Sequence, residues 1–153
     1  MKHSLLSGLL AAALLSASHG ALAHDDATLD KLAAPNGGQL RMAGPYHFEL
    51  VVTKNNKVAT DSPVTVYLTD HAGNKIATAG ASGTATLLAG KSKVTAALTA
   101  AGDNKFTGMA RYASDPKIKA IVAITFADKK SEQARFTPLA QAAAAVENGH
   151  SGH

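Results

Sequence analysis

Hydrophobic and polar residues alternate with a period of two over most of the chain between Gly38 and Phe136. Alternate side chains of a β-strand point to the same face, so this pattern predicts strands with one buried and one polar face. Glycine, asparagine, aspartate and proline interrupt the alternation at short intervals, as turns do. The pattern therefore predicts an antiparallel all-β domain, and the number of segments favours an immunoglobulin-like β-sandwich.

The clearest expected strand covers residues 46–53, where aromatic and aliphatic side chains occupy the even positions. His47 and Glu49 share the opposite face of that strand. Segment 118–126 carries the longest apolar alternation, which predicts a central strand. Further strands are expected at 64–68, 84–88, 93–98, 105–112 and 131–136, with 84–88 and 93–98 forming a hairpin.

The first 23 residues have the parts of an export signal. Lys2 provides the positive start, residues 5–15 form an apolar run, and Ala21-Leu22-Ala23 fits the small-x-small cleavage pattern. The apolar run is shorter than the roughly 18 residues that a membrane-spanning helix needs. We therefore expect cleavage after Ala23, a mature chain that starts at His24, a periplasmic location and no stable membrane insertion after cleavage.

These features divide the chain into four expected parts: a cleaved signal peptide at 1–23, an N-terminal segment at 24–36, the β-sandwich domain at 37–137, and a C-terminal part at 138–153. Pro138 and the alanine-rich residues after it predict a short helix over 139–147. Asn148 and Gly149 end that helix, and we expect a disordered tail that contains His150 and His153.

Composition narrows the function classes. The formal charge of +4 falls to +3 when Lys2 is lost, and the lysines are scattered, which argues against nucleic-acid binding. The absence of cysteine excludes disulfides and thiolate chemistry. The chain contains no catalytic or phosphate-binding motif. We therefore expect a protein that is not an enzyme and has no organic cofactor.

Metal binding is the chemistry that the remaining residues favour. The imidazole and the freed α-amine of an N-terminal His24 can together chelate one copper, nickel or zinc ion, and Asp26 adds a carboxylate nearby. Alternatively, His24 is only the residue left at the cut. His47 and Glu49 lie about 7 Å apart on one strand face, which suits either one shared ion or a direct hydrogen bond.

Other candidate ligands are weaker. His71 lies in a turn, and we expect it at the surface rather than on a metal ion. Met42 and Met109 could offer thioethers to monovalent copper, but methionine more often fills gaps in a core.

Residues 34–40 and 43–51 resemble a pattern of proline, histidine and two glycines followed by tyrosine-histidine-x-glutamate. That pattern is found in small periplasmic proteins and in the N-terminal β domains of adaptor subunits of bacterial heavy-metal efflux systems. Segments 67–74 and 132–136 are similar to the same group, so the resemblance covers about 34–138. It implies a β-sandwich linked to metal handling and maps onto His47 and Glu49. Asn36 departs from the pattern, because the group has a histidine there.

The sequence therefore predicts a periplasmic protein that binds or buffers copper, zinc or nickel and assists metal homeostasis or efflux, together with an efflux or envelope protein as partner. The predicted metal ligands are His24, His47, Glu49 and Asp26. The alternative is a non-catalytic interaction or structural module of the cell envelope in which the histidines are incidental.

Overall fold

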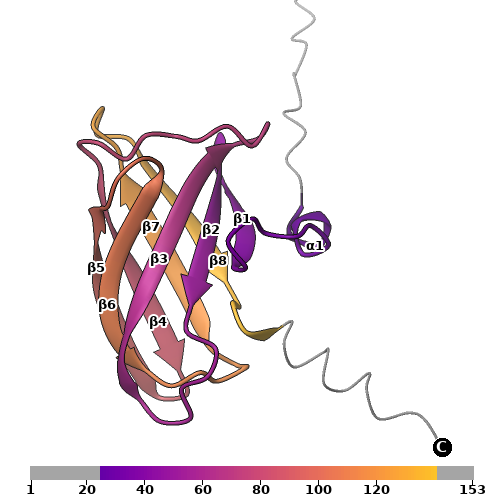
Figure 1. The fold of residues 1–153 in the computed structure, drawn as a ribbon, viewed down its shortest axis with the longest axis vertical. Helices are drawn as coiled ribbons and strands as arrows, with labels where there is room; N and C mark the ends of the chain where they lie inside the picture. Colours follow the sequence, from indigo (N-terminus) through magenta and orange to yellow (C-terminus); the bar gives the residue numbers. More distant parts are fainter. Residues whose placement is uncertain (1–24, 141–153) are drawn as a thin grey trace, which may run out of the picture.

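The structure is a computed structural model that describes residues 25–140, and these residues form a short helix followed by one antiparallel sheet of eight strands (Figure 1). The elements are α1 (Asp26–Leu29), β1 (Gln39–Ala43), β2 (Tyr46–Val52), β3 (Thr60–Asp70), β4 (Ser82–Ala89), β5 (Ser92–Ala100), β6 (Lys105–Tyr112), β7 (Lys119–Thr125) and β8 (Ser131–Phe136). The prediction of an antiparallel all-β domain is confirmed.

The strands follow the order β1-β2-β3-β6-β5-β4-β7-β8 in a single sheet. The sheet curls until β1 and β8, at its two ends, contact each other, so it is nearly closed and barrel-like (Figure 1). The ladder between β5 and β6 is short and pairs Thr99 with Thr107 and Ala100 with Phe106. The expected immunoglobulin-like sandwich of two separate sheets is not confirmed, because this short junction keeps the ladder continuous.

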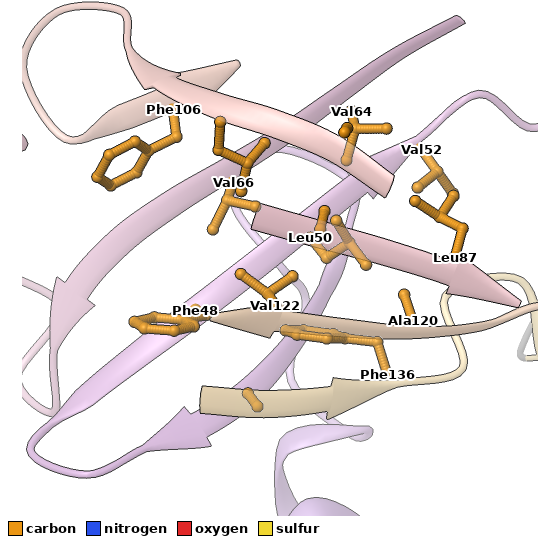
Figure 2. Close-up of a cluster of buried hydrophobic side chains, with 14 of the residues drawn as sticks. Phe48, Leu50, Val52, Val64, Val66, Leu87, Phe106, Ala120, Val122 and Phe136 are labelled. Carbon is orange, nitrogen blue, oxygen red and sulfur yellow. The ribbon is translucent and has the colours of Figure 1, made fainter. Parts of the chain in front are cut away.

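Alternate side chains of the strands fill the interior of the curled sheet, and Figure 2 shows side chains from β2, β3, β4, β6, β7 and β8 meeting in one cluster. The largest fully buried side chains are Phe48, Phe106, Leu29, Leu50, Leu68, Leu87, Leu98, Ile118 and Ile124. The even positions of β2, which the alternation predicted to share one face, therefore point into this core. β7 is not central, however, but lies second from one end of the sheet. Alternation reports one buried face and carries no information on a strand's place in the order.

The seam between β1 and β8 is closed by side chains. The backbone N–H of Thr137 donates to Oε1 of Gln39 at 2.8 Å, which links the first strand to the residue after the last. Arg41 is buried at the same seam and binds Asp30 just beyond α1, with Nη1 and Oδ1 at 2.7 Å. β1 was not among the predicted strands. Its inward positions 39 and 41 are polar, so its hydrophobic alternation is weak.

Several expectations concern residues outside 25–140. They are the signal peptide at 1–23, the position of His24, and the C-terminal tail, together with all but the first two residues of the helix expected over 139–147. Within 25–140 no helix is long and apolar enough to cross a membrane.

Candidate metal-binding site

The predicted pair His47 and Glu49 lies on the outer face of β2, opposite the core side chains of Phe48 and Leu50. An outer face would ordinarily be exposed, yet His47 and Glu49 retain only 8% and 3% of their surface. Both side chains are covered because the chain before β1 and the loop after β3 lie over this part of the sheet, where they enclose a cavity of about 470 Å³. The cavity wall is formed by Leu32, Ala33, Pro35, Asn36, Leu40, His47, Glu49, Tyr67, Thr69, Gly73, Lys75 and Asn104.

Glu49 holds the chain before β1 against the sheet. One carboxylate oxygen accepts the backbone N–H groups of Asn36 at 2.8 Å and Gly38 at 3.0 Å. The other accepts Nδ2 of Asn36 at 2.9 Å. A Cβ at Gly38 would lie 2.4 Å from the carbonyl oxygen of Leu50, so only glycine lets the backbone approach β2 this closely. Asn36, which replaces the histidine of the resembling pattern, is therefore used to bind Glu49.

His47 is packed against a second imidazole that the sequence did not assign to it. The ring of His71, from the loop after β3, stacks on the ring of His47 with 4.9 Å between centroids and 25° between planes. His71 is exposed, as its turn position predicted, while His47 is buried. The structure thus brings together two histidines that are 24 positions apart in sequence (71 − 47).

The loop that carries His71 is fixed by Asp70. Its Oδ1 accepts the backbone N–H groups of Ala72 at 2.9 Å and Asn74 at 2.8 Å, and its Oδ2 accepts Nδ2 of Asn74 at 2.9 Å. Gly73 adopts a φ of 85°, which glycine reaches without strain. The bonds from the side chain and backbone of Asn74 are the main reason that the pKa of Asp70 lies below its usual value. The ordered turn presents His71 to His47.

Lys75 ends the same loop at the rim of the cavity. Its Nζ lies 2.7 Å from Oδ2 of Asp103 in the turn between β5 and β6, and both side chains are about two-thirds exposed. The hydrogen bond with Asp103 and its charge raise the pKa of Lys75 above the usual value. An exposed ion pair of this kind contributes little to stability, but it connects the loop of His71 to a second turn.

The other predicted ligands are not gathered around His47. Asp26 belongs to α1 and lies 3.6 Å from Nε of Arg41, in the wall of a different cavity at the seam. His24 lies outside the described residues. Within 25–140, no three histidine, cysteine, aspartate or glutamate side chains come close enough together to hold a metal ion. The described part of the chain therefore offers a pair of imidazoles, and any further ligand of these types would have to come from elsewhere.

Sequence reasoning found His47 and Glu49 but missed what each of them contacts. The sequence did contain one sign that His71 could reach His47. His71 directly follows Asp70, in a turn that Asp70 and Asn74 close and that folds back over the sheet. Comparisons with protein-family models, with curated proteins and with solved structures found no match to this chain. The geometry of the site is therefore the main basis for a functional proposal.

Proposed function

We propose that the protein binds or buffers a transition-metal ion, copper, zinc or nickel, in the periplasm, and that it assists metal homeostasis or efflux without catalysing a reaction. His47 and His71 provide imidazole ligands in this proposal. The observation that carries it is the approach of these two rings to 4.9 Å between centroids. Histidine is the commonest ligand of such metals, and imidazole nitrogens suit copper, zinc and nickel alike.

The spacing of the rings suits one shared ion. An imidazole nitrogen binds zinc at about 2.0–2.1 Å, so the centres of two imidazoles on one tetrahedral ion lie roughly 5 Å apart. The two rings are now stacked at 25°, so a nitrogen from each reaches a common point only after a rotation about χ2. The loop of His71 is already ordered by Asp70, which lowers the entropic cost of binding.

Glu49 and Asp26 have supporting roles in this proposal rather than the direct ligation that the sequence predicted. The Glu49 carboxylate already accepts hydrogen bonds from Asn36 and Gly38, and Asp26 is paired with Arg41. A metal ion at either carboxylate would compete with these partners. The remaining ligands would come from His24 with its free amine, as the sequence predicts, or from a partner protein, which suits a site that passes its metal on.

Calorimetric titration of the mature protein with zinc, nickel and divalent copper tests the proposal. We expect a dissociation constant of about micromolar or tighter for at least one metal, weakened roughly tenfold or more by His71→Ala and by His47→Gln. The matched control is the double variant His150→Ala, His153→Ala, which removes two tail histidines and should leave this site intact. Equal affinity in all four proteins would reject His47 and His71 as ligands.

The alternative of a non-catalytic envelope module is favoured by a different observation. Leu32 is 53% exposed at the cavity, beside Pro35 and Ala33, and gives the rim an apolar character that a partner could cover. Under this alternative the midpoint of thermal unfolding stays constant when zinc or copper is added, whereas a metal that binds the folded state raises it.

A further inference from the structure

We propose that Met42 is a third ligand beside His47 and His71, and that the site therefore prefers monovalent copper over zinc. This inference rests on the proposed metal-binding function and names the ion that the site selects. A methionine more often fills gaps in a core, but the position of Met42 in the sheet places it outside the core.

The strand register places Met42 directly opposite His47. β1 and β2 pair antiparallel with Met42 and His47 as partners. Side chains of directly opposed residues lie on the same face, with Cβ atoms about 4.5–5.5 Å apart. Gln39, Arg41 and Ala43 are the buried residues of β1, whereas Met42 is only partly buried. Met42 therefore projects from the outer face next to His47 and is not a core residue.

His71 approaches this corner of the sheet from the other side. It lines one surface depression together with Gly44, Pro45, Asp70 and Ala72. Gly44 and Pro45 form the turn that joins β1 to β2, and Met42 is two residues before that turn. His71 thus stacks on His47 and shares a surface depression with the turn that follows Met42. The side chain of methionine has three rotatable bonds, which allow its sulfur to adjust toward the two imidazoles.

The donor set decides which ion is preferred. A thioether is a soft ligand that selects monovalent copper, while zinc sites use imidazole, thiolate and carboxylate. In the described part of the chain no third histidine, cysteine, aspartate or glutamate joins His47 and His71. The nearby Glu49 is already occupied by Asn36 and Gly38. Two imidazoles and one thioether therefore form a three-coordinate set without a hard ligand.

The test compares Met42→Leu with Met109→Leu in the mature, full-length protein. Met109 lies on the outer face of β6 and is 59% exposed, which makes it a matched control away from the histidines. Monovalent copper is titrated anaerobically against a chromophoric chelator, and zinc is titrated by calorimetry. All proteins keep the tail histidines, so any weak background from them is common to every measurement.

We expect Met42→Leu to weaken monovalent copper binding about tenfold or more and to change zinc binding less than about threefold, while Met109→Leu changes neither. Unaltered copper affinity in Met42→Leu would overturn this inference. If zinc binding still depends on His47 and His71 in that case, the proposed function survives. If neither ion binds above the tail background, the proposed function itself fails. Circular dichroism of Met42→Leu verifies that the sheet is retained.

Discussion

The carboxylate of Glu49 accepts two hydrogen bonds from Asn36, one from its backbone nitrogen at 2.8 Å and one from Nδ2 at 2.9 Å. This contact joins the chain before β1 to the outer face of β2 and covers the neighbouring His47. Glu49 is 3% exposed, so its charge is stabilised by these donors rather than by water. These hydrogen bonds therefore give Glu49 and Asn36 a structural role, which does not depend on direct contact between Glu49 and a metal.

Replacing Glu49 with alanine should detach the segment before β1. Three donors lose a charged acceptor, which we expect to lower the free energy of unfolding by about 2–4 kcal/mol. Urea unfolding followed by circular dichroism measures the loss. The matched control is Asp61→Ala on β3, whose side chain is 73% exposed and lies 3.9 Å from Arg111. Equal losses in the two variants would contradict the role given to Glu49.

The ion pair at the seam gives a second prediction. Arg41 is 8% exposed in its side chain and binds Asp30 and Asp26, which are 37% and 64% exposed. Since the two carboxylates keep contact with water, Arg41→Leu should cost only about 1–2 kcal/mol, less than the loss of a fully buried pair. Limited proteolysis should also cut near α1 sooner. Arg111→Leu, which alters an exposed arginine, should leave the free energy of unfolding and the rate of proteolysis unchanged.

Asp70 predicts a dependence of stability on pH. Its pKa in the folded protein is lowered from 3.8 by the hydrogen bonds of the turn, chiefly those from Asn74. A lowered carboxyl pKa contributes stability that is fully present above the unfolded value and is lost as the pH falls through the folded value. The stability difference between the native protein and Asp70→Asn should therefore be constant above about pH 5 and shrink below about pH 4. Urea titrations at several pH values measure it.

The same variant tests whether the turn positions His71. At neutral pH, Asp70→Asn should weaken zinc binding several-fold, because the turn around Asn74 loosens and ordering His71 costs more entropy. Asp128→Asn is the matched control, since the pKa of Asp128 is also lowered by its own turn, mainly through the backbone N–H of Lys130. Comparable affinity losses in the two variants would show that the effect is not local to His71.

The predicted copper chelate at His24 calls for a separate comparison. A chain that begins at His24 should bind divalent copper more tightly than a chain with one additional residue in front, because only the first presents both the imidazole and the α-amine. Mass spectrometry establishes the terminus, and a copper titration measures the difference. Identical titrations would remove His24 from the set of proposed ligands.

Much of the fold could be predicted from alternation, but its closure could not. The inward faces of β2, β3, β5 and β6 follow directly from the sequence, since their buried positions are apolar or small. β1 was missed because Gln39 and Arg41 occupy its buried positions and are satisfied by Thr137 and Asp30. Only contacts between residues distant in sequence establish that polar side chains seal the seam of a curled sheet.

The candidate metal-binding site, like the fold, was predictable only in part. His47 and Glu49 were correctly placed on one face of one strand, because strand geometry fixes that relation. The low exposure of His47 and Glu49 could not be predicted, since their burial depends on the segment before β1 and on the loop of His71. The stacking of His47 on His71 joins two elements, and no local pattern in the sequence encodes the distance between them.

Nuclear magnetic resonance of the imidazole nitrogens of His47 and His71, during separate titrations with zinc and with monovalent copper, tests the proposed site most directly. We predict that nitrogen resonances of both rings shift together and stop shifting at one equivalent of the preferred metal, whereas in His71→Ala the shift of His47 requires an excess of that metal. Metal binding by His47 and His71 would be contradicted if both rings kept their resonances with both ions while only the tail histidines responded.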